Sequence, residues 1–316
     1  MLVARYPCLR DVIGDGLSSW LVHLRNKFKN ERRKLEDNQL VLHHRAKFGN
    51  TKRPNDEVLA AEMHRTKREM ECMQTFCKYE DPESIRCHEE WLRKEVRKHA
   101  PDVAQVDARM DVTYKARSSD LAKMSVPASL EKYPYLADSR LFFKDFERLS
   151  KREAILSVER GFHQLIELTL NGTIPSNRSL LQTIQEVPHL PDKCSRRRKH
   201  LLAVTALRVL ARCLREGIGI LQLFVGKNVG DIPATPCIVY TGESLEDAEH
   251  LHLHVEKVQV FRVVDAEEGI AAIFSAHWLF QAKYAPKAYN ILTFVERVWY
   301  DLHVTTPRAS VVRLVN

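Results

Sequence analysis

The stretch that decides the fold is HLHLHVEKVQVFRVVDAEEGIAAIFSAHWL, residues 250–279, because the hydrophobic period changes within it. From Leu251 to Val264 apolar and polar residues alternate, which is typical of a β-strand with one buried face. From Asp265 onward apolar residues recur every three or four positions, which predicts an amphipathic helix. Asp265 is a favoured N-cap residue, and Glu268 follows it at capping-box spacing. The sequence therefore predicts a strand region followed directly by a helix.

The rest of the second half of the chain also contains both strand-like and helical segments. Two further apolar runs, residues 218–225 and 237–240, have the length and composition of short strands. Residues 201–216 and a segment that begins at Pro286 have helical spacing, and proline is favoured in the first turn of a helix. We therefore expect an α+β fold that is mainly helical, with the helices packed on a small sheet.

The middle of the chain carries the signals of paired helices. Asp81 precedes Pro82, which is the arrangement of an N-cap followed by proline at the first helical position. The breaker Ala-Pro-Asp at residues 100–102 separates this helix from a second one with apolar spacing. Residues 81–120 therefore predict a helical hairpin.

The N-terminal residues are organised differently. Apolar residues recur at helical spacing between Leu17 and Phe28, with basic residues on the opposite face, so residues 1–40 predict a basic amphipathic helical module. Residues 41–80 are polar and rich in breakers, and we expect a linker that is helical and poorly packed in part. The predicted organisation is a basic helical module at 1–40, a linker at 41–80, a helical hairpin at 81–120 and a C-terminal α+β domain at 121–316.

The net charge of +8 is concentrated in two short stretches. Residues 1–50 hold 10 basic and 5 acidic residues, and residues 151–200 hold 9 basic and 5 acidic residues, while the rest of the chain nearly cancels. Clustered lysine and arginine side chains are what proteins use to neutralise nucleic-acid phosphates. The candidate nucleic-acid-binding residues are Arg25, Lys27, Lys29, Arg32, Arg33, Lys34, Arg196, Arg197, Arg198 and Lys199.

Each basic cluster also has an ordinary structural interpretation. Glu31, Glu36 and Asp37 dilute the first cluster, which is equally compatible with the solvated face of a surface helix. The second cluster precedes the expected helix at 201–216, where four cations oppose the helix dipole by roughly a few tenths of a kcal/mol each. An exposed loop, a phosphate contact and a nuclear-import signal are all compatible with it.

The sequence contains none of the local motifs that carry known chemistry. A glycine-rich phosphate loop, a Gly-x-Ser-x-Gly elbow and a His-Glu-x-x-His pair are all absent. His250, His252 and His254 share one face of the expected strand, but next-but-one side chains lie about 7 Å apart, so a solvent-facing polar side is favoured over a metal site. We therefore expect no enzyme, no cofactor and no metal. A metal-dependent hydrolase that uses His252 and nearby carboxylates is a minor alternative.

Cysteine usage and hydropathy bear on the compartment. Seven cysteines in 316 residues are an odd number at low density, which argues against a disulfide framework. No apolar run approaches the length of about 18 residues that a membrane span needs, and the first residues lack the apolar core of a signal peptide. We expect a nuclear or cytoplasmic protein with no membrane partner.

Several stretches together resemble a known group of proteins. They are residues 267–278, 284–287 and 293–298, the segment from Tyr6 to Arg32 that contains Trp20, and residues 133–136 with 143–146. In these stretches the sequence resembles a multi-copy, largely uncharacterised fish protein family often labelled sterile alpha motif domain-containing protein 3-like, without the sterile alpha motif itself. The shared motifs are packing motifs, and the resemblance implies no enzyme activity and no defined site residues.

Three functions are compatible with these observations. The first, which we favour, is a non-enzymatic intracellular binding protein whose basic clusters engage DNA, RNA or an acidic protein. The second is a self-associating protein-interaction scaffold whose surface charge serves solubility. The third is the metal-dependent hydrolase. The relation of the two clusters in space separates the first two, because clusters on one face would form a continuous phosphate-binding surface.

Overall fold

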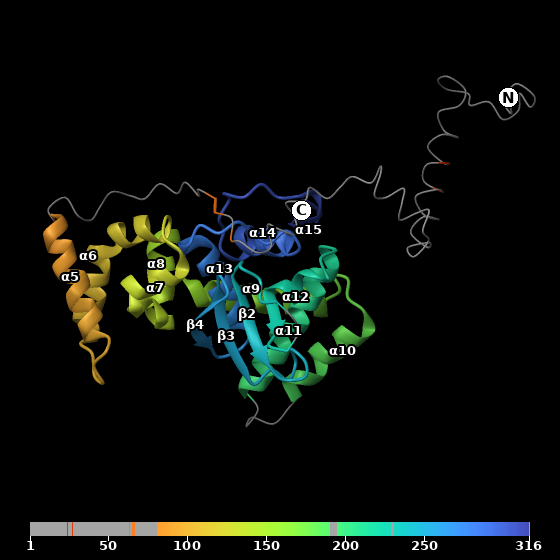
Figure 1. Cartoon of the computed structure of the whole chain (residues 1–316). Helices are drawn as coiled ribbons and strands as arrows, with labels where there is room; N and C mark the ends of the chain where they lie inside the picture. The colour runs from red at the N-terminus through yellow and green to blue at the C-terminus, as the bar shows by residue number, and fades with distance from the viewer. Residues whose placement is uncertain are drawn as a thin grey trace, which may run out of the picture. The chain divides into compact units, whose positions relative to one another are not determined.

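The computed structural model describes the greater part of the chain after residue 80. The described residues are 81–189, 195–228 and 231–315, together with Leu24, Lys27, Met63, Arg65 and Thr66. By their contacts the residues divide into two units, Met1–Val58 and Leu59–Asn316, and nearly all described residues belong to the second. Most elements of this second unit are labelled in Figure 1.

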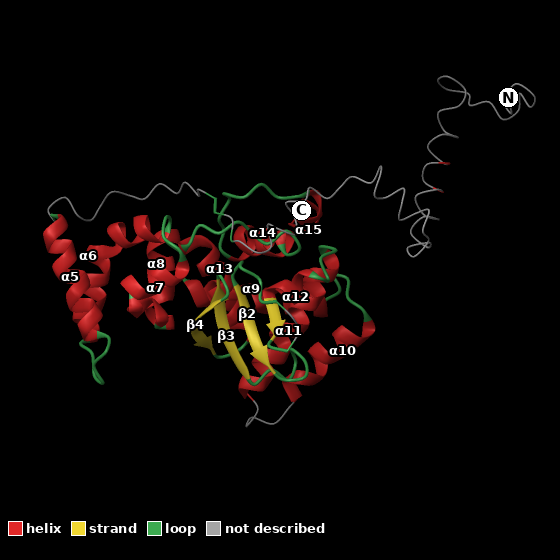
Figure 2. Cartoon of the chain, viewed as in Figure 1, coloured by secondary structure: helices red, strands yellow, loops and turns green. Residues whose placement is uncertain are grey.

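Helices make up most of the second unit (Figure 2). Before the sheet they are α5 (Pro82–Glu95), α6 (Val103–Leu121), α7 (Val126–Lys132), the 3-10 helix η2 (Pro134–Ala137), α8 (Ser139–Ser150), α9 (Ala154–Leu170), α10 (Arg178–Glu186), the 3-10 helix η3 (Val187–His189), α11 (Ser195–Cys213) and α12 (Gly219–Leu223). After the sheet they are α13 (Ala266–Leu279), α14 (Tyr289–Phe294), the π-helix η5 (Val295–Trp299) and α15 (Ala309–Val315). The expected hairpin is confirmed, because α5 packs against α6. Asp81 caps α5 by accepting a hydrogen bond from the Ser84 amide at 2.7 Å.

A mixed sheet in the described part of the chain has the strand order β1 (Phe224–Gly226), β2 (Cys237–Thr241), β3 (His250–Val255) and β4 (Val258–Val263). β1 runs parallel to β2, and the other neighbouring strands are antiparallel. Leu251 and Leu253 of β3 are buried, and α13 packs against β2, β3 and β4. Asp265 caps α13 by accepting hydrogen bonds from the Glu267 and Glu268 amides, as the sequence predicts. The mainly helical α+β fold is therefore confirmed.

The expected strand over residues 251–264 is wrong in one respect, because a tight turn interrupts it. Glu256 and Lys257 both have positive φ, 49° and 66°, and they reverse the chain between β3 and β4. A two-residue turn of this kind favours glycine, asparagine or aspartate, and none of these residues is present to signal it. The alternation does break at this point, because Glu256 and Lys257 are both polar, and this break is the signal of a hairpin that the expectation of one strand overlooked.

Two other boundaries differ from expectation. The run at 218–225 begins as helix α12, and only its last residues belong to β1. A short apolar run fits a buried helix as well as a buried strand, so its periodicity does not separate the two. α11 begins at Ser195, before the expected start at Leu201, so the second basic cluster lies inside the helix.

The core joins helices from both ends of the second unit. Phe146 of α8 contacts Phe274 of α13 and Tyr300, with ring centroids 5.8 and 5.2 Å apart. Arg117 of α6 and Asp145 of α8 form an ion pair in which both side chains are fully buried, with hydrogen bonds of 2.6 and 2.7 Å. This pair ties the α5–α6 hairpin to the rest of the core.

A short segment ahead of the hairpin also docks on this unit. Arg65 donates hydrogen bonds to two carbonyl oxygens at the turn between α6 and α7, and it lies 3.6 Å from the Glu256 carboxylate. The Thr66 amide donates to the Gln281 carbonyl oxygen at 2.6 Å, and Met63 packs against the core. We call Met63, Arg65 and Thr66 the strap. Part of the expected linker thus packs on the second unit, while the predicted domain boundaries stay predictions.

Candidate functional site

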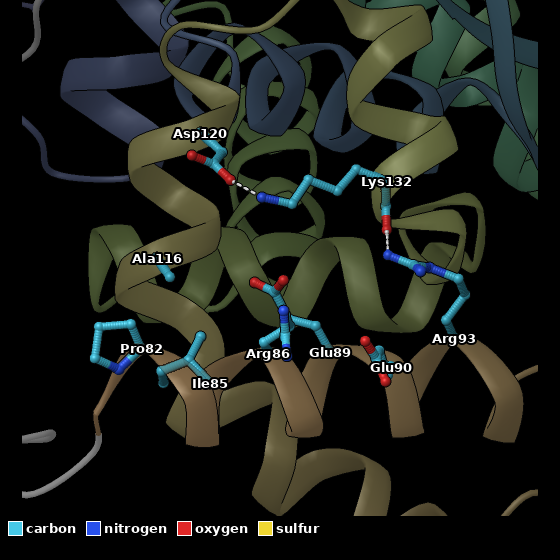
Figure 3. A pocket seen from close by; sticks show the side chains of 9 residues that line it. All are labelled: Pro82, Ile85, Arg86, Glu89, Glu90, Arg93, Ala116, Asp120 and Lys132. Carbon is cyan, nitrogen blue, oxygen red and sulfur yellow. Dashed lines mark hydrogen bonds and ion pairs between the residues drawn. The ribbon is translucent and has the colours of Figure 1, made fainter.

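A groove of about 630 Å³ lies between α5, α6 and the end of α7 (Figure 3). Its lining mixes charges of both signs with small apolar side chains. The lining residues are Pro82, Ile85, Arg86, Glu89, Glu90, Arg93, Ala116, Asp120 and Lys132. We call this cavity the α5–α6–α7 groove.

The groove exists because local hydrogen bonds fix the connection between its helices. Asp102 caps α6 by accepting a hydrogen bond from the Gln105 amide, and its own amide donates to the Glu95 carboxylate of α5, each at 3.0 Å. Ser125 then caps α7, which ends at Lys132. From there the Lys132 side chain reaches back to α6, as Figure 3 shows.

Lys132, Asp120 and Tyr133 form a hydrogen-bonded cluster at one wall of the groove. Lys132 Nζ lies 2.5 Å from Asp120 Oδ2, and the Tyr133 hydroxyl donates to the same oxygen at 2.6 Å. Burial of Asp120 tends to raise its pKa, but the hydrogen bonds from Lys132 and Tyr133 outweigh burial and hold the pKa below its usual value. Burial raises the pKa of Tyr133 well above its usual range, so this hydroxyl keeps its proton.

Glu89 is the carboxylate on the opposite wall, which α5 forms. The residue is only 8% exposed, and its Oε1 lies 3.2 Å from the Tyr133 hydroxyl.

The cations of the groove are engaged elsewhere. Arg86 pairs at 2.6 Å with a glutamate one turn away on α5, and Arg93 donates to the Lys132 carbonyl oxygen at 3.2 Å.

This arrangement is suited to holding charged groups. Tyr133 keeps its proton, and both Lys132 and Tyr133 donate to Asp120 Oδ2, so these three groups are engaged with one another. Six of the nine lining residues are charged, while apolar atoms provide the larger part of the lining surface. The groove therefore combines charged groups of both signs with apolar surface.

The second predicted basic cluster lies in the first turn of α11, and its side chains have intramolecular acceptors. The contacts are Arg196 with the Val264 carbonyl oxygen at 2.9 Å, Arg197 with Asp247 at 2.7 Å, Arg198 with the Pro188 carbonyl oxygen at 3.3 Å, and Lys199 with Glu159 at 2.5 Å and Glu267 at 3.2 Å. These acceptors offset the repulsion between the cations and the helix dipole, which explains how α11 can begin at Ser195. The acceptors of these four side chains could not be identified from the sequence.

The first predicted basic cluster lies almost wholly outside the described residues. Lys27 is described, and it is helical and exposed. Leu24, from the opposite apolar stripe, is also helical and 46% exposed. The other members lie outside the described residues, and they are Arg25, Lys29, Arg32, Arg33 and Lys34. The binding role of both clusters stays a prediction.

His250, His252 and His254 lie on the face of β3 opposite the buried Leu251 and Leu253. Burial lowers the pKa of His252 and of His254, which favours their neutral imidazoles. Within residues 81–189, 195–228 and 231–315, no group of three His, Cys, Asp or Glu side chains is placed to hold one metal ion. Nor does any helix in these ranges combine the length and the apolarity that crossing a bilayer requires.

The sequence did not single out the groove residues, although one signal was available. Glu89 lies three positions before the fully buried Leu92 and four after the half-buried Ile85, so it is a carboxylate on the inward face of an amphipathic helix. Such a group is almost never buried without a partner. No pattern predicts that Tyr133, 44 residues away in the chain, meets it, because that contact depends on tertiary packing.

Comparison with known proteins agrees with part of the resemblance seen in the sequence. The chain is 22% identical over 311 residues to sterile alpha motif domain-containing protein 3 of Homo sapiens, which covers 96% of this chain and 57% of the relative. It is 22% identical over 304 residues to the Mus musculus protein of the same name, which covers 95% of this chain and 58% of the relative. No family model and no solved structure matches the chain. The chain thus spans a little over half the length of these relatives, and its similarity to sterile alpha motif domain-containing protein 3 is weak but extends over most of its residues.

Proposed function

We propose that the chain is a non-enzymatic binding protein that holds another protein in the α5–α6–α7 groove. The observation that supports this most directly is the lining of the groove, in which three cations and three carboxylates surround a few small apolar side chains. Charged pairs across an interface steer association and fix its register. Each positive or negative side chain of the groove can therefore pair with a side chain of opposite charge on a partner protein.

The same lining disfavours nucleic acid at this place. Three carboxylates repel phosphates, and binding to nucleic acid relies on an excess of lysine and arginine. The cations of the second basic cluster are already in contact with acceptors in this chain, which reduces what they can offer to a phosphate. A protein partner therefore fits the described residues better than DNA or RNA does.

The test is a selection of 12-residue peptides from a random library on the full chain. The groove variant Arg86→Glu with Glu90→Lys swaps two exposed charges and keeps the net charge. The matched control, Arg178→Glu with Glu186→Lys, makes the same swap on the exposed side of α10. Selected peptides should bind the groove variant at least tenfold more weakly and the control unchanged. The proposal fails if no peptide is enriched or if enriched peptides bind all three proteins equally.

Self-association is the case in which the partner is a second copy of the chain. It would make the protein a scaffold, and the apparent mass would then rise with concentration. Light scattering over a hundredfold range of concentration measures this. A constant monomeric mass would contradict the scaffold form and leave a different protein as the partner.

Nucleic-acid binding through residues 25–34 is a second candidate. The supporting observation is that Lys27 is helical and exposed, in the stretch where the sequence gathers positive charge. Fluorescence polarisation with DNA and RNA at low and moderate salt tests it, since phosphate contacts weaken steeply with salt. Binding that survives Arg32→Ala with Arg33→Ala, or no binding at low salt, contradicts it. Both candidates are compatible with action in the nucleus or the cytoplasm.

A further inference from the structure

We infer that Glu89 is the receptor for a positively charged side chain, the ammonium of a lysine or the guanidinium of an arginine on the partner protein. This inference rests on the proposed function, in which the α5–α6–α7 groove holds a protein. It adds which residue of the groove makes the central contact and which chemical group of the partner binds to it.

Glu89 is a buried carboxylate whose one hydrogen-bond donor among the described residues is shared with a second carboxylate. Its one hydrogen-bonding neighbour among the described residues is the Tyr133 hydroxyl, which lies 3.2 Å from Oε1. That hydroxyl has a single hydrogen, and Asp120 Oδ2 lies closer to it, at 2.6 Å. The Tyr133 hydroxyl therefore donates chiefly to Asp120, and its contact with Glu89 is the longer and weaker of the two.

A carboxylate in this position is costly to the free protein. Burial removes most of its hydration, since the residue is 8% exposed, and a buried charge without a partner is strongly unfavourable. An arriving ammonium or guanidinium supplies both an opposite charge and several N–H donors. A cation bound in the groove would therefore stabilise Glu89 more than the shared Tyr133 hydroxyl does.

The cations that line the groove do not provide this relief. Lys132 is bonded to Asp120, Arg86 is paired with a glutamate on its own helix, and Arg93 donates to a backbone carbonyl oxygen. No ion pair within 4.0 Å joins Glu89 to any of them in the described part of the chain. Glu89 and the exposed Glu90 are thus the lining carboxylates that a new cation meets.

The shape of the groove suits a long basic side chain. In Figure 3 the Glu89 side chain rises from α5 toward Asp120 and Lys132, into the space between the helices. Ile85 and Ala116 lie beside this space and offer apolar surface. Lysine and arginine bury their methylene stems on such surface while the charged head reaches a polar group.

The experiment titrates the full chain with N-acetyl-arginine methylamide and N-acetyl-lysine methylamide, followed by amide chemical shifts. The uncharged analogue N-acetyl-citrulline methylamide has the shape of the arginine probe without its charge. Glu89→Gln removes the charge of the receptor, and Glu90→Gln removes the charge of its exposed neighbour as a matched control. We expect a charged probe to perturb groove amides in the natural protein and in Glu90→Gln, with at least tenfold weaker binding in Glu89→Gln.

Three results would overturn the inference. They are equal binding to Glu89→Gln, equal binding of the citrulline probe, and no perturbation of groove amides by either charged probe. Loss of the fold is checked by thermal unfolding, and Glu89→Met serves as a second variant without a charge. The citrulline comparison uses only the natural protein, so it decides the question even if both variants unfold.

Failure of this inference differs from failure of the proposed function. Groove-dependent peptides that contain no basic residue would uphold the proposed function and remove the role of Glu89. A charged probe that binds at Glu89, with no peptide enriched by selection, would uphold the cation receptor and remove the protein partner.

Discussion

Glu267 makes the stability of the fold depend on pH. It lies in the first turn of α13 with a side chain that is 8% exposed, 3.2 Å from Lys199. Burial raises the pKa of Glu267 to about 7 from its ordinary value of 4.5, and the nearby Lys199 opposes this only in part. Because the folded state holds its proton more tightly than the unfolded state, this contribution is complete below pH 4.5 and is lost as the pH rises through 7.

Replacement of Glu267 by glutamine should therefore flatten the fall of stability between pH 5 and 8. The part of the free energy of unfolding that depends on this group is on the order of 3 kcal/mol. Urea unfolding of the natural protein and of Glu267→Gln at four pH values measures it. Glu243→Gln, at an exposed position, is the control. Parallel curves for the natural protein and Glu267→Gln would refute the assignment.

The buried pair of Arg117 and Asp145 should be sensitive to the loss of one partner. Asp145→Asn leaves the Arg117 guanidinium charged and buried without its counter-ion, and such a loss is worth about 3–5 kcal/mol of stability. Asp111→Asn, which breaks an exposed pair with Arg148 instead, should change stability by less than about 1 kcal/mol. Chemical denaturation of both variants tests the contrast. A similar small effect of both would contradict the role given to the buried pair.

At the level of single residues, the sequence predicted what depends on near neighbours. Asp81 and Asp265 cap helices as expected, because a cap needs only amides two or three positions away. The contacts of Glu89 and of the cluster at Arg196–Lys199 could not be predicted in this way. Their partners come from other helices and loops, and only packing brings them together.

The turn between β3 and β4 is an element boundary that the sequence analysis did not predict. Lys257 adopts a φ of 66°, in the left-handed region that favours glycine. Lys257→Gly should therefore raise stability by roughly 0.5–1 kcal/mol. Gln259→Gly, an exposed position inside β4, should lower it, since glycine weakens a strand interior. Thermal unfolding of the two variants should move in opposite directions, and a loss of stability in Lys257→Gly would refute this account.

Elements with a strong local signature were predictable, and elements fixed by packing were not. The hairpin α5–α6 and the helix α13 carry caps and sustained helical spacing, so their existence followed from the sequence. The run at 218–225 is short and apolar, and its split into α12 and β1 depends on what surrounds it. The helix α15 is short and was not expected.

The strap should stay bound to the rest of its unit even after the chain is cut between the strap and α5. A protease site engineered into residues 70–76, between Thr66 and Asp81, would separate the strap from the rest of its unit. The contacts of Arg65 and Thr66 should keep the two pieces together in gel filtration. Arg65→Ala should release the N-terminal piece, while Arg53→Ala should not. Complete separation of the natural pieces would show that the strap adds little.

At the scale of the whole molecule, the fold class followed from the sequence because it depends on averages over many residues. The change from alternation to helical spacing at residues 250–279 was enough to predict helices on a small sheet. The groove was not predictable, because it depends on α5, α6 and α7 meeting at particular side chains. The relation between the two basic clusters depends in the same way on tertiary structure.

The ion pair between α6 and α8 also bears on how the chain can be shortened. A fragment that begins after residue 121 would retain Asp145 and lose Arg117, and would bury a lone carboxylate in its core. A fragment that ends there would carry the orphaned cation instead. A fragment that is meant to keep this ion pair therefore has to contain both α6 and α8.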